Sequence, residues 1–576
     1  MKMIGADAFV KSLQKEGVDV LFCYPGGQVI PEFDALYTQD KVKHILVRHE
    51  QGAAHAADGY ARVTGKVGVC LATSGPGGTN LVTGIANAYM DSIPMVAFTG
   101  QVPTSMIGTD FFQEADITGI TLPITKHNYL VKDVRELPQV IKEAFYIAST
   151  GRPGPVLIDI PGDVARAPLP SFDYPESVKM AGYKPTYKGH ARQIKQAANM
   201  IAEAERPLLY AGGGILRARA WKELAQLAEL AKIPVCWTLM GKGAFPDTHE
   251  LNIGMPGMHG ARYTNYSICH CDLLIGVGVR FDDRVTGKLA EFATDAKKVH
   301  IDIDPAEIGK NVPIDVPIVG DAKNVLGGVL AAIKGREGFK PKTGAWLDQI
   351  EQWRKRYPLA YDQGEGAAIK PEFLVEQIYE TTKDREAIIA TEVGQNQMWA
   401  AQFYQSTQPL SFVSSGGLGT MGFGLPAAMG AKFGAPDKLV IDIAGDGSIQ
   451  MNSQEFATCV ANGLDLKVVI INNGYLGMVR QWQELFWDKR YSDTDLRVGT
   501  PDFVKLVEAY GGTGMRIERP EEVAGALEKA YETPGVVVLD VLVEREQNVY
   551  PMVAPGAPIK EMLGGVDLDE MFAADA

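Results

Sequence analysis

The sequence has few cysteines, no long apolar run and no cluster of basic residues. No stretch approaches the roughly 20 apolar residues that a membrane-spanning helix needs. The residues after Met1 follow a helical pattern rather than that of a signal peptide. Because the net charge is −14 and nucleic-acid binding requires basic surfaces, we expect no nucleic-acid partner. We therefore predict a cytoplasmic protein that binds neither nucleic acid nor a membrane.

The six cysteines are scattered, apart from Cys269 and Cys271, which flank His270. This spacing does not match a structural zinc site, and no second pair follows. Reduced, mostly buried thiols are the better interpretation, as in a cytosolic protein.

Hydrophobic residues make up 46% of the sequence and charged residues 22%, which is typical of a globular protein. Short β-branched runs alternate with helical patterns, so we predict an α/β fold with three doubly wound parallel sheets. The predicted domains and segments are 1–170, 189–340 and 370–545, a Pro-rich linker at 167–188 and a C-terminal tail at 546–576.

Polar residues follow two apolar strands of the third domain. Asp446 lies in the turn Gly445–Ser448 after the run 439–443, and Asn473 ends the run 466–471. We expect both at the carboxyl ends of parallel strands, where α/β sheets bind ligands. A carboxylate and an amide oxygen are suitable ligands for Mg²⁺, and the glycines let a phosphate approach the backbone. The alternative is an ordinary turn with a solvated Asp446.

Glu50 stands at the end of a predicted strand and enters an Ala-rich helix. A buried carboxylate there is unfavourable unless it has a partner or a function. The alternative is a simple interaction with the helix dipole. Zinc is excluded because His49 and His55 are not four residues apart, as the zincin motif requires.

These motifs occur together with others in a fixed order. The chain resembles the catalytic large subunits of acetohydroxyacid synthases, also called acetolactate synthases, which depend on thiamine diphosphate (ThDP). The resemblance covers residues 3–560 and rests on the Gly445–Ser448 turn and on the segments 48–53, 74–77, 151–156, 280–287, 419–428 and 473–482.

The resemblance implies a pyrimidine-binding first domain, an FAD-binding central domain and a diphosphate-binding third domain. The implied reaction decarboxylates pyruvate on ThDP and transfers the resulting hydroxyethyl carbanion to a second 2-ketoacid. Pyruvate as acceptor gives 2-acetolactate, and 2-ketobutyrate gives 2-aceto-2-hydroxybutyrate. Both products belong to the biosynthesis of valine, leucine and isoleucine.

For ThDP, the resemblance matches Glu50 to the glutamate that hydrogen-bonds N1′ of the aminopyrimidine. A carboxylate there favours the imino tautomer, which removes the proton from thiazolium C2. Met421 matches the apolar residue beneath the bent cofactor, with core filling as the alternative. Asp446, Asn473 and the Tyr475 carbonyl match the Mg²⁺ ligands. The other matching catalytic or ThDP-binding positions are Gly27, Gln113, Pro76, Asn80, Val393, Gly394, Gln395, Gly419, Gly447 and Ser448.

The Gly-x-Gly signals of the central domain are weak, since neither completes a dinucleotide-binding fingerprint. FAD is therefore implied by the resemblance alone, in a non-redox role because the net reaction has no redox change. The matching positions are Arg152, Gly212, Gly213, Thr238, Leu239, Met258, His259, Arg280, Asp302 and Asp321.

Substrate selection is implied at four positions. Arg284 matches the arginine that pairs with the acceptor carboxylate. Trp482 matches the tryptophan that favours 2-ketobutyrate, although it could instead be an exposed packing residue, and Phe112 and Met478 match further pocket residues. Three positions depart from the family pattern: Gly162 in place of lysine, Asn396 in place of histidine, and Gln28 in place of a small residue.

In this family the two halves of a ThDP site come from different subunits, so the resemblance implies a homodimer or homotetramer, with 2-ketoacids as substrates. A separate regulatory small subunit is also expected. The alternatives are another ThDP enzyme, such as a catabolic acetolactate synthase or pyruvate oxidase, or a non-catalytic flavin-binding subunit. The segment 280–287 and Trp482 argue against the first two, and retention of Glu50, Asp446 and Asn473 argues against the third.

Overall fold

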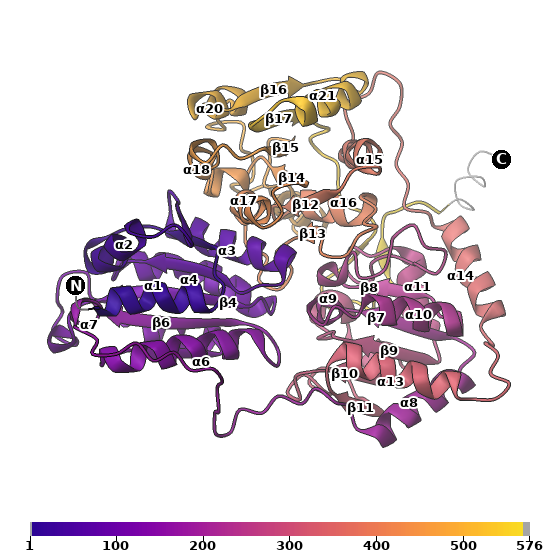
Figure 1. Cartoon of the computed structure of the whole chain (residues 1–576). Coiled ribbons are helices and arrows are strands. Elements are labelled where there is room, and N and C mark those ends of the chain that lie inside the picture. Colours follow the sequence, from indigo (N-terminus) through magenta and orange to yellow (C-terminus); the bar gives the residue numbers. More distant parts are fainter. Residues whose placement is uncertain (1–2, 568–576) are drawn as a thin grey trace.

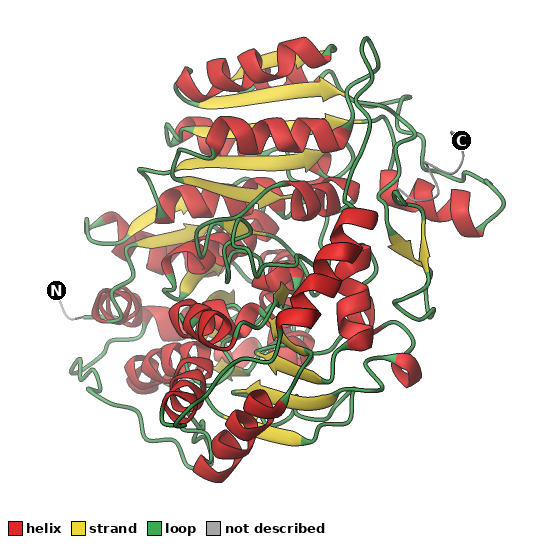
Figure 2. Ribbon diagram, turned by 90° about the vertical axis from the view of Figure 1, so that its right-hand side faces the viewer, coloured by secondary structure: helices red, strands yellow, loops and turns green. Residues whose placement is uncertain are grey.

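The computed structural model describes residues 3–567; the rest of the predicted tail, 568–576, lies outside the described residues. The chain forms three parallel sheets covered by helices, with the third sheet at the top of Figure 1. Figure 2 shows the helices stacked against the sheets. The predicted fold class, α/β with three parallel sheets, is confirmed.

The first sheet has six strands in the order β2-β1-β3-β4-β6-β5. Its strands β3, β4 and β6 are short apolar runs that are buried on both faces, as is usual for parallel sheets between helices. The strands are β1 Val20–Cys23, β2 Lys43–Leu46, β3 Gly68–Ala72, β4 Met95–Gln101, β5 His127–Leu130 and β6 Pro155–Pro161; the helices are α1 Gly5–Lys15, α2 Ile30–Tyr37, α3 Glu50–Thr64, α4 Pro76–Met90, α5 Ile117–Thr121, α6 Leu137–Ser149 and α7 Gly162–Arg166.

The central sheet has five strands in the order β11-β10-β9-β7-β8. The Trp-bearing segment that follows it in the sequence is α14, and the Trp346 indole donates to the Pro207 carbonyl at 3.2 Å. The strands are β7 Pro207–Ala211, β8 Val235–Trp237, β9 Leu273–Val277, β10 Lys297–Asp302 and β11 Val316–Val319; the helices are α8 Ala191–Glu203, α9 Gly213–Arg217, α10 Trp221–Ala231, α11 Arg262–His270, α12 Asp283–Thr286, α13 Ala322–Lys334 and α14 Gly344–Arg356.

The third sheet repeats the six-stranded design of the first, in the order β13-β12-β14-β15-β17-β16. A two-stranded ladder, β18 Met552–Val553 with β19 Met562–Leu563, lies beyond it in the tail. The strands are β12 Ala387–Thr391, β13 Phe412–Val413, β14 Leu439–Gly445, β15 Leu466–Asn472, β16 Thr513–Ile517 and β17 Val536–Leu542; the helices are α15 Pro371–Thr382, α16 Gln395–Phe403, α17 Gly424–Gly434, α18 Glu455–Ala461, α19 Gly477–Phe486, α20 Phe503–Ala509 and α21 Pro520–Glu532.

The first and third sheets are joined through α3 and α17, two helices made largely of small residues. A Cβ atom added to Gly430 would lie 1.9 Å from the Ala56 carbonyl oxygen, and one added to Gly59 would lie 2.0 Å from that of Ala427. The two backbones therefore pack directly on each other, which only glycine permits at these positions. Glu50 opens one of these helices, and Met421 directly precedes the other.

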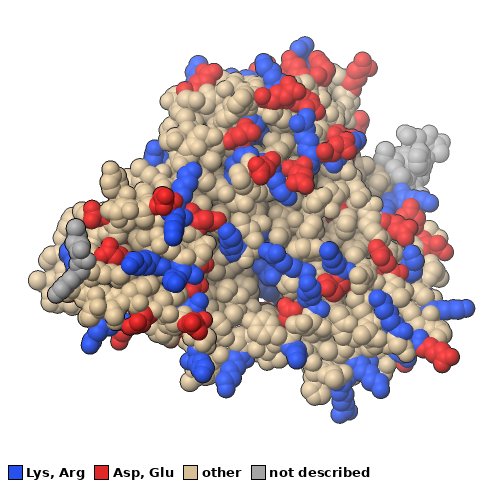
Figure 3. Space-filling view, viewed as in Figure 1, with Lys and Arg blue, Asp and Glu red and all other residues tan. Residues whose placement is uncertain are grey.

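The surface carries charge of both signs. On the face shown in Figure 3, basic and acidic side chains are interspersed. Within residues 3–567, none of the helices combines the length and the apolar character that a bilayer crossing would require.

Candidate active site

The Glu50 side chain is held by a residue of α4, the next helix along the chain. Its side chain is 8% exposed at the first turn of α3, where a carboxylate interacts favourably with the helix dipole. Asn80 Nδ2 donates a hydrogen bond to Glu50 Oε2 at 2.9 Å. A Cβ on Gly77 would lie 3.6 Å from Glu50 Oε1, so this oxygen lies next to a residue that has no side chain. Glu50 therefore presents one fixed oxygen and one that can still accept a hydrogen bond.

Asp446 and Asn473 lie at the carboxyl ends of the neighbouring strands β14 and β15, where Gly445 pairs with Ile471. Asp446 is 2% exposed, and its Oδ2 has no hydrogen-bond partner. Burial raises the pKa of this carboxyl to about 7. A bound cation would reverse that effect, because it stabilises the ionised form. A buried, unpartnered carboxylate oxygen beside an amide fits a Mg²⁺ ligand set.

The side chain of Asn473 is fixed by two hydrogen bonds. Its Oδ1 accepts from the Tyr475 backbone N–H at 3.0 Å, and its Nδ2 donates to Gln395 Oε1 at 3.2 Å. The Tyr475 ring in turn lies 4.3 Å from the guanidinium of Arg545. The loop that carries Asn473 and Tyr475 is thereby attached to α16, whose first turn contains Gln395.

Met421 sits in a loop that a buried acid holds in place. Gly419 and Gly422 have φ of 71° and 83°, and the Glu392 carboxylate accepts the backbone N–H groups of Gly422 at 2.8 Å and of Leu425 at 3.2 Å. A Cβ on Gly447 would lie 3.9 Å from Met421 Cε. Met421 therefore borders the turn that contains Asp446.

Glu392 has a second acid beside it, which the sequence analysis did not identify as functional. Asp442 is fully buried in β14, and both of its carboxylate oxygens lack hydrogen-bond partners. Burial raises the pKa of both carboxyls, and the proximity of Glu392 raises that of Asp442 further. Because the backbone N–H groups stabilise a charge on Glu392, the shared proton belongs on Asp442.

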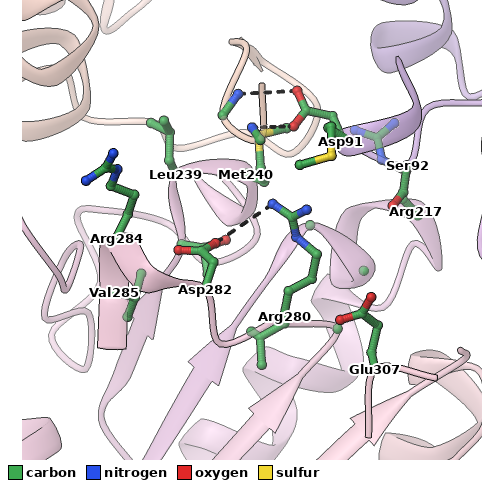
Figure 4. Close-up of a pocket in the computed structure, with 18 of the residues that line it drawn as sticks. Asp91, Ser92, Arg217, Leu239, Met240, Arg280, Asp282, Arg284, Val285 and Glu307 are labelled. Atoms are coloured by element: carbon green, nitrogen blue, oxygen red, sulfur yellow. Dashed lines mark hydrogen bonds and ion pairs between the residues drawn. The ribbon is translucent and has the colours of Figure 1, made fainter. Parts of the chain in front are cut away.

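A cavity of about 730 Å³ extends from the central sheet to the loops of the third sheet (Figure 4). Nine of the ten sequence-predicted FAD positions line it, and the tenth, Gly212, packs behind the wall against Gly278. The lining also includes Val393, Gly394, Gly419, Arg284, Met478 and Trp482. The Arg284 guanidinium lies 5.9 Å from the centre of the Trp482 ring, so two predicted substrate residues are in contact.

The residues of the first domain that were predicted to bind ThDP or substrate lie apart from this cavity, whereas the predicted FAD residue Arg152 lines it. Phe112 is 80% exposed, Gly27 and Pro76 are exposed, and none of the three lines it. Gln113, at φ 60°, packs its backbone against Gly75. Within the described residues, no hydrogen bond or ion pair connects the Glu50 carboxylate to the Asp446 turn. One chain thus carries two separate half-sites.

Two of the departures from the family pattern face each other. A Cβ on Gly162 would lie 2.4 Å from Gln28 Oε1 and 3.1 Å from Arg166 Nη2. The larger Gln28 side chain fills the space that Gly162 leaves, and Arg166 brings a cation next to it. The third departure, Asn396, donates a hydrogen bond to the Ile443 carbonyl at 2.8 Å.

Comparison with known proteins agrees with this arrangement. Three family models match the chain: the N-terminal TPP-binding domain of thiamine pyrophosphate enzymes at residues 3–120, their central domain at 194–329 and their C-terminal TPP-binding domain at 392–541. Thiamine pyrophosphate is another name for ThDP. The chain therefore has the three domains of a ThDP-dependent enzyme.

Similarity to individual proteins narrows the class. The chain is 50% identical to the acetolactate synthase large subunit of Corynebacterium glutamicum, over 100% of this chain and 92% of that protein. It is 50% identical to the probable large subunit of Methanocaldococcus jannaschii, over 97% and 95%, and 49% identical to that of Cyanidium caldarium, over 97% and 96%. The chain belongs to the acetolactate synthase large-subunit family, the biosynthetic enzymes that join 2-ketoacids.

Proposed function

We propose that this chain performs the ketoacid carboligation of its family at a site assembled from the two half-sites described above. One observation carries the proposal: a single cavity connects Arg284 and Trp482 with the Val393–Gly394 turn beside the Asp446 loop. A carboxylate-bearing acceptor can then be oriented by a cation and an aromatic ring next to the diphosphate-side loops.

The residues of the chain have distinct roles in this proposal. The chemistry that ThDP would supply when bound is a nucleophilic carbon for addition to the keto group of pyruvate. Glu50 Oε1 holds and exchanges a proton with the aminopyrimidine, while Asn80 keeps the carboxylate oriented through Oε2. Met421 supports the cofactor from the loop that Glu392 holds. Arg284 pairs with the acceptor carboxylate, and Trp482 contacts its alkyl group.

Two further cofactors are part of the proposal. The unpartnered Oδ2 of Asp446, the Asn473 amide and the Tyr475 carbonyl would hold Mg²⁺, with Gly447, Ser448 and the 393–395 turn near the diphosphate. The 730 Å³ cavity has room for FAD, which would have a structural role because carboligation transfers no net electrons.

The proposed active form contains at least two copies of the chain. Within residues 3–567, no hydrogen bond or ion pair joins the Glu50 half-site to the Asp446 half-site, and Phe112 of the first domain is exposed. A second copy would complete both sites and cover this apolar side chain. A regulatory small subunit, as the relatives' designation as large subunits suggests, would be a further partner. All six cysteines are free, as expected for a cytoplasmic protein.

A colorimetric acetoin assay tests the function. Purified protein supplied with pyruvate, ThDP and Mg²⁺ should form acetolactate, and omission of either cofactor should abolish the product. Formation of hydrogen peroxide or acetyl phosphate instead of acetolactate would indicate a pyruvate oxidase. Absence of any product from correctly folded protein with FAD and a small subunit added would contradict the proposal.

A further inference from the structure

Four arginines line the large cavity, and three of them have carboxylate partners. Arg152 pairs with Glu307 at 2.6 Å, Arg280 with Asp282 at 3.8 Å, and Arg284 with Asp283 at 3.8 Å. Arg217 differs: within residues 3–567 it makes no ion pair or hydrogen bond, and its Nε is buried without a partner. Figure 4 shows it at the cavity wall beside Asp91 and Ser92.

The carboxylates nearest to Arg217 are already engaged by another cation. Arg62 binds Asp58 at 2.5 Å and Asp91 at 2.7 Å, and the other Asp91 oxygen accepts from the Gly417 N–H at 2.7 Å. Burial, followed by repulsion from Arg62, lowers the pKa of Arg217 to about 10. At neutral pH the side chain is therefore a cation that lacks a bound counterion, an unfavourable state for a partly buried charge.

The wall next to Arg217 is suited to a phosphate. Arg217 ends α9, which begins in the Gly212–Gly214 turn after β7. Gly213 and Gly214 of this turn line the cavity, and neither has a side chain that would shield the backbone there. A planar guanidinium beside an open glycine turn matches the oxygens of a phosphate group.

The same cavity offers carboxylates for sugar hydroxyls. Asp302 and Asp321 line it, and each uses Oδ1 to accept a backbone N–H, from Asp304 and Asn324 respectively. Their Oδ2 atoms accept no hydrogen bond from the described residues. A cation for a diphosphate and carboxylates for ribose hydroxyls together describe a dinucleotide.

We propose that Arg217 is the phosphate-binding cation of this cavity and contacts the diphosphate of a flavin dinucleotide. The inference rests on the FAD assignment proposed above and adds the residue that neutralises the most highly charged part of that ligand. Arg217 is then paired only in the ligand-bound protein, so its charge opposes the stability of the free protein and favours binding.

Equilibrium titration of the flavin-free protein with FAD, ADP and riboflavin tests this inference. In R217Q, the Kd values for FAD and ADP should rise about 10- to 100-fold, as for loss of a charge-assisted hydrogen bond, while the Kd for riboflavin stays unchanged. R217K should lie between R217Q and the wild type. The control is R219Q, since Arg219 is exposed and only donates to the Thr64 carbonyl.

Thermal melting gives a second readout that a purely structural role would not produce. Flavin-free R217Q should melt at or above the wild-type temperature, whereas the rise in melting temperature caused by FAD should be smaller. Equal FAD affinity of R217Q and wild type, or an equal loss of riboflavin binding in R217Q, would overturn the role of Arg217 alone. Failure of the wild type to bind either FAD or ADP would overturn both this inference and the FAD assignment.

Discussion

The backbone contact between α3 and α17 gives the sharpest prediction, because a single methyl group tests it. In G430A the new Cβ would lie 1.9 Å from the Ala56 carbonyl oxygen. Carbon–oxygen contacts are normally at least about 3.3 Å, so the helices must separate by more than about 1 Å. Overpacking of this kind costs about 1–3 kcal/mol, partly offset by the better helix propensity of alanine, about 0.5–1 kcal/mol.

The separation also moves the active-site residues. Glu50 opens α3 and Met421 precedes α17, and a displacement of about 1 Å can lower a rate about 100-fold. We expect G430A to melt about 2–8 °C below the wild type and to lose most of its acetolactate-forming activity. The control is G525A in α21, where no atom lies within 4 Å of the new Cβ. A melting temperature and a kcat of G430A equal to those of G525A would refute the direct packing of the two helices.

Three other changes have defined outcomes. E392Q should weaken ThDP binding and lower the free energy of unfolding by about 1.5–3 kcal/mol, because an amide replaces the charged acceptor of two backbone N–H groups. D442N should leave both nearly unchanged, because Asp442 is already uncharged. ThDP titration and thermal melting measure the two effects, and equal losses in both variants would contradict the assignment of the proton to Asp442. W482L should change the preference between 2-ketobutyrate and pyruvate by about 10- to 200-fold at most, and an unchanged product ratio in a competition assay would remove Trp482 from the acceptor pocket. Burial raises the folded-state pKa of Asp159 to about 7, so its contribution to stability is present below about pH 4 and is lost as the pH rises through 7. In D159N the melting temperature should therefore fall less between about pH 4 and 7 than in the wild type. An equal fall in both proteins would contradict a raised pKa of Asp159.

Much of the fold could be predicted from local sequence. The apolar β-branched runs that precede Asp446 and Asn473 are indeed buried parallel strands, and their pairing in the same sheet brings the two side chains to one edge. Helix boundaries are less well defined by local sequence: α18 spans Glu455–Ala461 and follows a short 3-10 turn at Ile449–Met451. Hydrogen bonding in the turn decides that boundary, and the apolar pattern does not report it.

The acid pair was missed because its members lie on different strands. Glu392 follows β12 and Asp442 lies within β14, and only the parallel register of these strands, in which Ala390 pairs with Asp442, brings them together. One signal was available: Asp442 interrupts an otherwise apolar run, and a buried carboxyl in a strand needs a physical reason. Gln28 and Gly162 illustrate the same limit, since each was noticed alone and only tertiary structure shows that one side chain fills the space left by the other.

Most of the predicted FAD residues line the cavity, but the sequence did not predict that they enclose one. A family resemblance supplied the positions that line it, whereas Arg217 matched no motif and became significant only because its neighbours Asp58 and Asp91 are occupied by Arg62. Pairing between charged groups depends on the packing of three domains, which local sequence does not encode.

Mixing two inactive variants tests most directly whether carboligation occurs at a site shared between subunits. E50Q removes one half-site and D446N the other, and each should be inactive alone. After the two variants exchange subunits, every mixed dimer contains one intact site, so acetolactate formation should recover to about a quarter of the wild-type rate. No recovery, despite mixed dimers detected by differently tagged chains, would contradict a site completed by the second subunit.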